Sequence, residues 1–294
     1  MTTLIADSGS TKTHWALIID QPGVPRQVRL ADTLGLNPLY VTPQQVTDAL
    51  RQVLAQVGVA SPDALCFYGS GCSGERVAVV ERSLRAALTP MTRVTVQSDL
   101  MGAALALGSP ASGQGAVDVS QPFVSCILGT GAIAALCEPA SSQLHPMPAL
   151  GYILGDEGSG AWFGRHLLSD YLKHQMPPRV CDAFEDDFGA ITAEAAIQHV
   201  YQQPAPNRYL AQFAAFLGRH LDLRYCQALA FRGVDEFWRR NVLPIASHPQ
   251  WAEVRDVRLV GSVAFHLRPI VEQVAESHDY YVSRIIKDPI VGLI

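Results

Sequence analysis

Apolar and polar positions follow a hairpin pattern over residues 4–19. Residues 4–6 are apolar, Asp7 follows, and a turn of small and hydroxyl residues precedes the apolar residues 15–19. Two apolar runs joined by a tight polar turn are typical of a β-hairpin. Because the turn is rich in Gly, Ser and Thr, its backbone N–H groups are accessible to a phosphate. The candidate phosphate contacts are Ser10, Thr11, Lys12 and Thr13.

Asp7 ends the first apolar run, where a carboxylate can hold Mg²⁺ directly or through water. The turn is not a Walker P-loop, because G-x-x-x-x-G-K-[ST] is absent and no helical pattern follows it. This segment alone fits equally well a polar turn in which Asp7 bonds to its own backbone. A solvated lysine at the tip is likewise an alternative for Lys12.

A second segment repeats this organisation about 120 residues later. Residues 123–128 are mostly apolar, the turn Gly129-Thr130-Gly131 follows, and apolar residues resume at 132–136. Two such turns facing each other would hold the phosphates of one nucleotide between two lobes. Neither turn is diagnostic alone, and the pair is more specific.

Helices and strands alternate between the two hairpins. Thr42-Pro43 starts a helix whose apolar stripe ends at Gly58. Strands are predicted at 26–32, 64–68 and 93–97, and helices at 75–88 and 100–107. Antiparallel strands followed by alternating helices and strands predict an α/β lobe.

The second half of the chain opens with strands and continues with longer helical patterns. Residues 108–121 are rich in Gly, Ser, Pro and Ala, and we expect the lobes to meet there, between 118 and 119. The predicted elements beyond it are strands at 122–128, 132–138 and 257–260 and helices at 159–175, 192–202, 208–222, 225–242 and 263–275.

The composition indicates a compact globular protein, with 48% hydrophobic and 17% charged residues. Its 294 residues are enough for two domains. A net charge of −5 argues against a nucleic-acid-binding surface. The longest apolar stretch is interrupted by Ser, Gly and Thr and is too short to span a bilayer. We therefore expect no nucleic-acid and no membrane partner.

The six cysteines and nine histidines show no metal-binding spacing. Neither C-x-x-C nor H-x-x-x-H occurs, which argues against structural zinc or an iron–sulfur cluster. We expect reduced thiols in a cytoplasmic protein.

Asp99 is the candidate catalytic base. It follows an apolar strand and precedes a helix, and ligands of α/β sheets bind outside the carboxyl ends of the strands. A carboxylate placed there can accept the proton of an attacking hydroxyl. A helix N-cap formed by Ser98 or Asp99 is the alternative interpretation.

The stretch 151–164 carries two adjacent carboxylates, Asp156 and Glu157, among five glycines. Flanking glycines leave room for a polyol to approach and be held by its hydroxyls. Pairing of the carboxylates with the dipole of the following helix is the alternative. Asn37, in the turn before Pro38, is a further candidate for a sugar hydroxyl, although N-P is also a common turn signal. Gly261-Ser262 stands before a helix, where it would admit a nucleotide base or simply allow tight packing.

Together these residues resemble the sugar-kinase/actin/Hsp70 superfamily of two-lobed ATPases. Within it, the chain is similar to the N-acetylglucosamine kinase branch, grouped with the BadF/BadG/BcrA/BcrD ATPases. The likeness covers essentially the whole chain. It rests on residues 7–13, Asn37, Ser98-Asp99, 128–131, 151–164 and 257–264.

The resemblance implies two ribonuclease-H-like lobes, residues 1–118 and 119–276, with ATP and sugar in a cleft between them. It also implies a final helix, about 277–294, that returns to the first lobe. The implied activity is ATP-dependent phosphorylation of the 6-hydroxyl of an amino sugar, foremost N-acetylglucosamine, with Mg²⁺.

The resemblance also assigns roles to single residues. Asp99 matches the base that activates the 6-hydroxyl, and Asp7 matches the residue associated with Mg²⁺. The implied sugar contacts are Asn37, Asp99, Asp156 and Glu157. The implied ATP contacts are Ser10, Thr11, Lys12, Thr13, Gly129, Thr130, Gly131, Gly261 and Ser262.

Positions 132, 133 and 262 depart from the family pattern. The family usually has Gly-Gly where Gly261-Ser262 stands here, which alters the region expected to bind adenosine. After Gly131 the family usually has Ser and then often Asn, whereas Ala132-Ile133 stand here and cannot make those hydrogen bonds. A non-kinase relative that senses a sugar or nucleotide, or an ATPase driven by a partner, is therefore the alternative function. An acyl or small-acid kinase is a third interpretation. A homodimer is left open.

Overall fold

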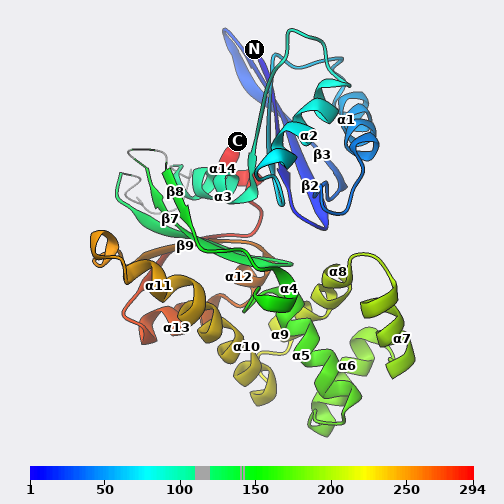
Figure 1. Cartoon of the computed structure of the whole chain (residues 1–294), viewed down its shortest axis with the longest axis vertical. Coiled ribbons are helices and arrows are strands. Elements are labelled where there is room, and N and C mark those ends of the chain that lie inside the picture. Colours follow the sequence, from blue (N-terminus) through cyan, green and yellow to red (C-terminus); the bar gives the residue numbers. More distant parts are fainter. Residues whose placement is uncertain (110–119, 140, 142) are drawn as a thin grey trace. The chain divides into compact units, whose positions relative to one another are not determined.

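The computed structural model describes residues 1–109, 120–139, 141 and 143–294. The chain forms two compact units: unit 1 is Met1–Ala111 with Asp288–Ile294, and unit 2 is Ser112–Lys287. Each unit is built on a five-stranded sheet with helices (Figure 1). The expected α/β organisation with two lobes is therefore confirmed. The expected boundary at 118 and 119 lies outside the described residues.

The sheet of unit 1 has the strand order β3-β2-β1-β4-β5. The chain enters with the antiparallel strands β1 (Thr2–Ser8), β2 (Lys12–Gln21) and β3 (Val24–Leu34), and then adds β4 (Ala64–Gly69) and β5 (Arg93–Ser98) parallel to β1. The predicted N-terminal hairpin and the three further strands of this lobe are confirmed.

Helices cover both faces of this sheet. They are α1 (Pro43–Val57), α2 (Glu75–Arg85), α3 (Asp99–Gly108) and the short α14 (Ile290–Leu293). Side chains alternate between faces along a strand. Leu4 accordingly packs with Leu50 of α1 and Leu84 of α2, whereas Ile5 packs with Ile290 of α14.

The helix α1 shows how local sequence fixes an element. The Thr42 side chain accepts a hydrogen bond from the Gln45 amide, and the Gln45 side chain accepts one from the Thr42 amide. This reciprocal capping box satisfies two amides that the helix itself cannot. Gly58 ends the helix in a left-handed conformation, with φ of 74°. The start and end predicted from Thr42-Pro43 and Gly58 are confirmed.

The sheet of unit 2 repeats the topology of unit 1, with the order β10-β9-β6-β7-β8. It consists of the antiparallel strands β6 (Phe123–Leu128), β7 (Ala132–Glu138) and β8 (Gln143–Pro146), and of β9 (Asp256–Val260) and β10 (Tyr281–Ile286) parallel to β6. The repetition of a hairpin followed by parallel strands is the one that the two Gly/Thr turns indicated.

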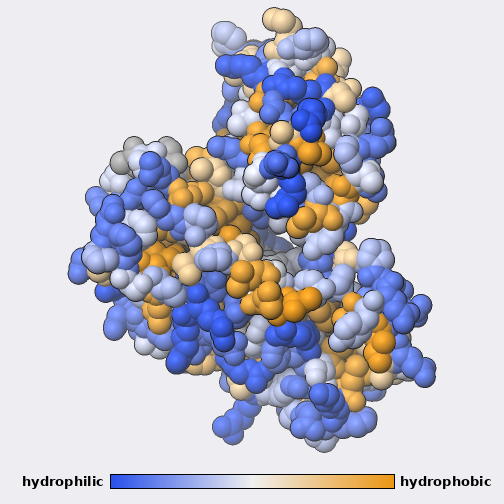
Figure 2. Space-filling view, viewed as in Figure 1, coloured by the Kyte–Doolittle hydropathy of each residue, from blue (hydrophilic) through white to orange (hydrophobic). Residues whose placement is uncertain are grey.

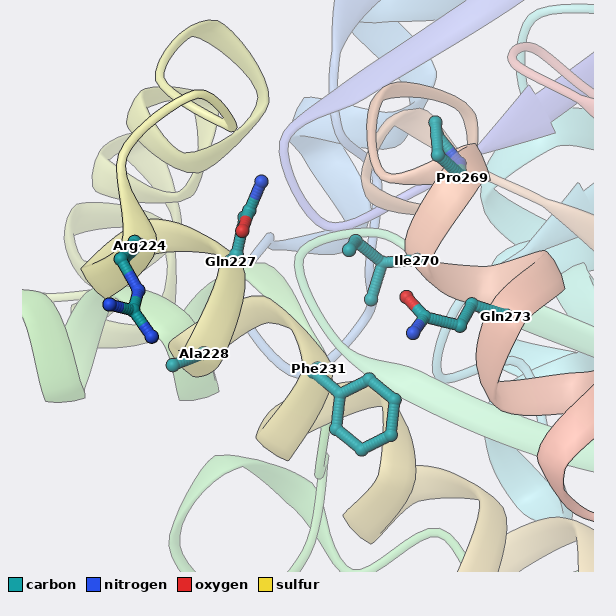
Figure 3. A pocket seen from close by; sticks show the side chains of 7 residues that line it. All are labelled: Arg224, Gln227, Ala228, Phe231, Pro269, Ile270 and Gln273. Atoms are coloured by element: carbon teal, nitrogen blue, oxygen red, sulfur yellow. The ribbon is translucent and has the colours of Figure 1, made fainter.

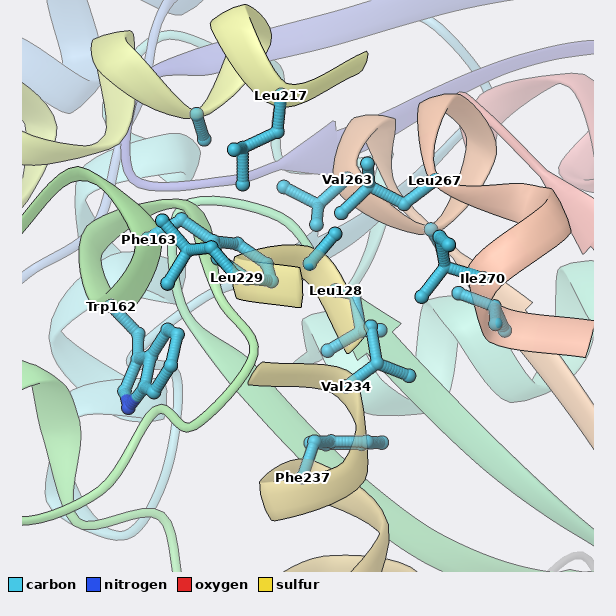
Figure 4. Packing of buried hydrophobic residues seen from close by; sticks show 14 of the residues in the cluster. Leu128, Trp162, Phe163, Leu217, Leu229, Val234, Phe237, Val263, Leu267 and Ile270 are labelled. Carbon is cyan, nitrogen blue, oxygen red and sulfur yellow. The ribbon is translucent and has the colours of Figure 1, made fainter. Parts of the chain in front are cut away.

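The α-helices of unit 2 are α4 (Gly151–Leu154), α5 (Gly160–Leu172), α6 (Pro178–Phe188), α7 (Ala193–Ile197), α8 (Pro206–Ala211), α9 (Ala215–Arg219), α10 (Arg224–Phe237), α11 (Leu243–Ala246), α12 (Ser262–His266) and α13 (Arg268–Ser277). Together with the π-helical turns that continue them, Gln198–Gln202 and Trp238–Val242, the helices α7 and α10 match the predicted runs at 192–202 and 225–242. The run predicted at 263–275 breaks at Leu267, before Pro269. The core between sheet and helices joins Leu128 of β6 to Phe163 of α5, Val234 of α10 and Val263 of α12 (Figure 4).

The expected final helix at about 277–294 is wrong. The segment leaves α13 at Ser277, takes a left-handed turn at Asp279 (φ 62°), forms β10 in unit 2 and ends with α14 in unit 1. The residues of β10 include Val282, Ile285 and Ile286, and such β-branched side chains favour a strand.

The surface of unit 2 carries one exposed apolar segment next to a predicted site. Leu150, Ile153 and Leu154, in and before α4, are 57%, 69% and 73% exposed, and α4 buries no residue. Figure 2 shows hydrophobic residues gathered where α4 lies. Within the described part of the chain, no helix has the length and apolar character needed to cross a membrane.

Close packing of α5 against α8 depends on Gly164. A Cβ atom at this position would overlap the carbonyl group of Leu210. We expect Gly164→Ala to force the two helices apart and lower the free energy of unfolding by about 1–3 kcal/mol or more. Urea denaturation measures the change. Gly108→Ala is the matched control, because the described residues leave open space around Gly108. Equal stability of Gly164→Ala and the wild type would contradict this packing.

Candidate active site

The register of the unit 1 sheet brings the predicted residues of that unit to one edge. Ser8 of β1 pairs with Gly69 of β4, which pairs with Ser98 of β5. These three parallel strands therefore end together, and the residues around their ends, Asp7, Ser70 and Asp99, lie at the same edge. This is the edge where α/β sheets bind ligands.

The hairpin tip between β1 and β2 presents some of its predicted phosphate contacts and buries another. Ser10 is partly exposed, and Thr11 and Lys12 are exposed. Lys12 is paired with Asp32, with its Nζ 3.0 Å from Oδ2. Thr13 is fully buried, and its hydroxyl donates to the Leu34 carbonyl oxygen at 3.0 Å and lies 2.8 Å from the Ser8 hydroxyl. The Thr13 side chain thus anchors the tip from behind.

Residues after β3 support the tip, and sequence reasoning did not single out their role. The Gly35 amide donates to the Thr11 carbonyl oxygen at 3.0 Å, and the Leu36 amide donates to the Ser8 hydroxyl at 3.1 Å. A Cβ atom on Gly35 would lie 2.5 Å from the Gly9 carbonyl oxygen. Only glycine therefore fits at position 35, and its place two residues before Asn37 was the signal available in the sequence.

Asn37 lies beneath the tip and is 4% exposed. Its side-chain amide nitrogen donates to the Ser10 hydroxyl at 3.2 Å and to the Ser70 hydroxyl at 3.4 Å, and its oxygen accepts from the Leu39 amide at 2.9 Å. The structure therefore places this predicted sugar contact beside the phosphate turn and within an internal hydrogen-bond network.

Asp7 is a buried carboxylate among other carboxylates. Burial is the main cause that raises its pKa to about 7, and the negative charges of Asp99 and Asp288 raise it further. Within the described residues, no group donates a hydrogen bond to the Asp7 carboxylate. A cation beside Asp7 would offset this concentration of negative charge.

The donor chemistry at Asp7 fits Mg²⁺ bound together with phosphates. Mg²⁺ usually keeps several waters and takes one or two carboxylates plus substrate phosphates. Among the described residues, no group of three or more His, Cys, Asp or Glu side chains is arranged to hold a metal ion. The predicted ion at Asp7 would accordingly depend on ligands from nucleotide phosphate and water.

Ser98 and Asp99 divide the two roles that the sequence left open. The Ser98 hydroxyl accepts from the Met101 amide at 3.3 Å and so caps α3. The Asp99 carboxylate accepts from the Leu100 amide at 2.9 Å, and Ser70 lies beside it, because Gly69 and Ser98 are register partners. Burial raises the pKa of Asp99 to about 6, although the Leu100 amide and Ser70 lower it. A carboxylate with this pKa is mostly ionised at pH 7 and can act as a proton acceptor.

The second Gly/Thr turn, between β6 and β7 in unit 2, is held by α5 and by Gly261. The Gly160 amide donates to the Gly129 carbonyl oxygen at 2.7 Å, and the Ala161 amide donates to the Thr130 carbonyl oxygen at 3.1 Å. Gly261 has φ of 115°, and a Cβ atom there would overlap the Leu128 carbonyl oxygen. The predicted residues Gly129, Thr130, Gly131 and Gly261 are therefore neighbours, and Ser262 is exposed at the start of α12.

Asp156 faces this turn, whereas Glu157 points to residues 240 and 241, which follow α10. The Asp156 carboxylate accepts from the Ala132 amide at 3.2 Å, and a Cβ atom on Gly131 would lie 3.1 Å from it. Burial raises the pKa of Asp156 above its usual value, and the Ala132 amide lowers it. Asp156 also has φ of 56°, a strained conformation for a residue with a side chain. Glu157 instead contacts Arg240 at 3.6 Å and Asn241 at 3.4 Å.

The groove between α10 and α13 on unit 2 contains none of the predicted site residues (Figure 3). It has a volume of about 520 Å³ and is lined by Arg224, Gln227, Ala228, Phe231, Pro269, Ile270 and Gln273.

Comparison with known proteins identifies the fold and the family. No family model matches the chain, and no curated protein matches it. Among solved structures, a ROK-family glucokinase from Streptomyces griseus, in complex with glucose and AMPPNP, aligns with a TM-score of 0.57 at 12% identity over 100% of this chain and 97% of its own. A "putative N-acetylglucosamine kinase" from Chromobacterium violaceum aligns with a TM-score of 0.65 at 21% identity, over 99% and 96% of the two chains.

The fold is therefore that of the two-lobed sugar kinases. A further structure, the "putative N-acetylglucosamine kinase" from Porphyromonas gingivalis, aligns with a TM-score of 0.84 at 35% identity, over 99% of this chain and 96% of its own. The chain belongs to the family of that protein.

The raised pKa of Asp7 has a consequence for stability. Between the ordinary value of 3.8 and the folded value of about 7, the folded protein holds more protons than the unfolded chain. The free energy of unfolding must therefore fall as the pH rises through this window. We expect Asp7→Asn to be more stable than the wild type at pH 8, by about 1–3 kcal/mol, and to lose most of this advantage near pH 4. Thermal unfolding in magnesium-free buffer measures both.

Asp63→Asn is the control of opposite sign. Hydrogen bonds from the Thr2 amide and hydroxyl lower the pKa of Asp63, so its carboxylate contributes to stability above its usual pKa. This variant should lose stability at pH 8. An advantage of Asp7→Asn that is the same at both pH values would show that Asp7 titrates normally.

Proposed function

We propose that this protein is an ATP-dependent sugar kinase that phosphorylates the 6-hydroxyl of an amino sugar, with N-acetylglucosamine as the first candidate. The observation that carries the proposal is the placement of Asp99 at the shared edge of β1, β4 and β5, beside the first Gly/Ser/Thr turn. The family relationship to the P. gingivalis protein supports the reaction class and makes its named sugar the first to test.

Asp99 is the proposed base. Its pKa of about 6 keeps it mostly ionised at neutral pH while leaving it a better proton acceptor than an ordinary aspartate. Because Ser98 already caps α3, the Asp99 carboxylate is available to accept the proton of the attacking 6-hydroxyl. Proton removal assists attack on the γ-phosphorus of ATP.

Phosphate binding is assigned to the two turns. Ser10, Thr11 and Lys12 of the first turn, with Thr13 behind them, and Gly129, Thr130 and Gly131 of the second would contact the phosphates of ATP. Gly261 and Ser262 would border the adenosine. Mg²⁺, held at Asp7 through water, would offset the negative charge of the phosphates.

Sugar binding is assigned to Asp156 and to the groups around Asp99. The Asp156 carboxylate is fixed by the Ala132 amide, and its strained backbone indicates a functional constraint. Asn37 and Glu157 remain candidate sugar contacts, although both already have protein partners. All six cysteines are free thiols, and we accordingly propose a cytoplasmic location.

Release of ADP with a panel of sugars tests the proposed activity. The panel is N-acetylglucosamine, glucosamine, glucose, N-acetylmannosamine, N-acetylmuramic acid and no sugar, each with Mg·ATP. We expect strong stimulation by an amino sugar. Asp99→Asn should lower kcat by about 100-fold or more, because it removes the proton acceptor, while binding of ATP and sugar is retained.

Two results would contradict this assignment. Equal loss of substrate binding and turnover in Asp99→Asn would make Asp99 structural. A panel without stimulation, with nucleotide binding intact, would favour a sensor or a partner-driven ATPase, and Ala132-Ile133 would be the first positions to change.

Neighbouring carboxylates allow a matched test of the sugar site. Asp156→Asn should lower kcat/KM for the sugar by about 10- to 100-fold, because a charged hydrogen-bond partner is lost, with a small change in KM for ATP. Glu157→Gln should have a smaller effect, because Glu157 faces Arg240 and Asn241. The reverse order, with the larger loss in Glu157→Gln, would exchange the two assignments.

A further inference from the structure

A chain of polar side chains connects the first phosphate turn to Asp99 inside unit 1. Ser10 lies at the hairpin tip, Asn37 follows β3, Ser70 follows β4 and Asp99 follows β5. The Asn37 side chain bridges the hydroxyls of Ser10 and Ser70, at 3.2 and 3.4 Å. Ser70 and Asp99 directly follow Gly69 and Ser98, which are register partners on β4 and β5, so the two residues are neighbours, and Ser70 lowers the pKa of Asp99. Four segments that are distant in the sequence therefore share one network.

The direction of each hydrogen bond follows from the one partner that can only donate. The Leu39 amide lies 2.9 Å from the Asn37 side-chain oxygen, so this oxygen must face Leu39. The Asn37 NH₂ group therefore faces both serines and donates to their oxygens. Because the Ser70 oxygen accepts from Asn37, the Ser70 proton is left to donate to another group, and the neighbouring ionised Asp99 carboxylate can only accept.

Packing leaves the network little freedom to rearrange. Gly71 has φ of 76°, and a Cβ atom there would overlap the Asn37 side-chain oxygen. A Cβ atom on Gly69 would lie 2.5 Å from the Phe67 ring and 2.7 Å from the Cys72 sulfur. These two glycines thus let the segment after β4 approach Asn37 and the core, which holds Ser70 between Asn37 and Asp99.

We propose that Ser70 is a positioning residue for the base: its hydroxyl, oriented by Asn37, holds the Asp99 carboxylate in the arrangement that accepts the proton of the sugar hydroxyl. This inference rests on the proposed sugar kinase function. A carboxylate with two oxygens can rotate about its bond to Cβ, and the Leu100 amide holds one of these oxygens at 2.9 Å. The Ser70 hydroxyl adds a second restraint, from a different strand.

A positioning role predicts a particular kinetic pattern. Ser70 acts on Asp99 and not on a substrate, so its loss should lower kcat and leave both KM values nearly unchanged. It should also have no effect where Asp99 is already disabled, because residues in one network are not additive.

The test compares four variants on the stimulating sugar with Mg·ATP. Ser70→Ala should lower kcat by about tenfold or more, with KM for sugar and ATP within about threefold of the wild type. Ser70→Thr keeps a hydroxyl and should restore most of the activity. Ser70→Ala in the Asp99→Asn background should cause no further loss. Ser73→Ala is the matched control in the same segment, because the Ser73 hydroxyl contacts the exposed Arg76. Melting temperatures check that each variant is folded.

Other results would overturn either the role of Ser70 alone or the proposed kinase function as well. Full activity of Ser70→Ala beside an inactive Asp99→Asn overturns the role of Ser70 and leaves the kinase assignment standing. A raised KM for sugar with unchanged kcat makes Ser70 a sugar ligand and also overturns it. A wild-type protein without sugar-dependent turnover overturns the proposed function and the role of Ser70 with it.

Discussion

The common end point of β1, β4 and β5 is the constraint on which the unit 1 site depends. Because Ser8, Gly69 and Ser98 are in register, the residues near the strand ends meet at one edge. Asp7 and Asp99 are thereby brought close enough for the charge of one to raise the pKa of the other. Two carboxylates removed from water in this way are costly unless a cation or a proton compensates them. The same arrangement therefore favours a bound cation or a proton beside these carboxylates.

Glycines supply the second constraint, because backbone must approach backbone at both turns. Gly35 lies against the first turn and Gly261 against the second, and neither leaves space for a side chain. In unit 2 the first amides of α5 donate to the carbonyl oxygens of Gly129 and Thr130. The shape of each turn is thus set by neighbouring elements, and this preorganisation would lower the entropic cost of holding the proposed phosphates.

Much of this architecture could be predicted from local sequence. The hairpins, the helix between Thr42 and Gly58, and most positions of strands along the chain follow from periodicity and turn residues. The prediction of a final helix was wrong. It rested on the family resemblance, whereas the β-branched residues of β10 favour a strand. Hydrogen-bond partners were not predictable, because they join segments that are distant in the sequence. Thr13 is buried against Leu34, and Glu157 faces Arg240, whereas its neighbour Asp156 faces the turn 129–131. Ser70 was not singled out in the sequence, because its contact with Asn37 requires the folded sheet.

The proposed transfer of a phosphoryl group from ATP to the sugar 6-hydroxyl is tested most directly by phosphorus NMR of the product. A phosphate on O6 couples to the two hydrogens of C6, whereas a phosphate on O1 couples to a single hydrogen. The account predicts a new phosphomonoester signal split into a triplet when wild-type protein is incubated with Mg·ATP and N-acetylglucosamine or another stimulating amino sugar. Formation of ADP and inorganic phosphate alone, with every sugar, would contradict it, because water and not a sugar would then be the acceptor.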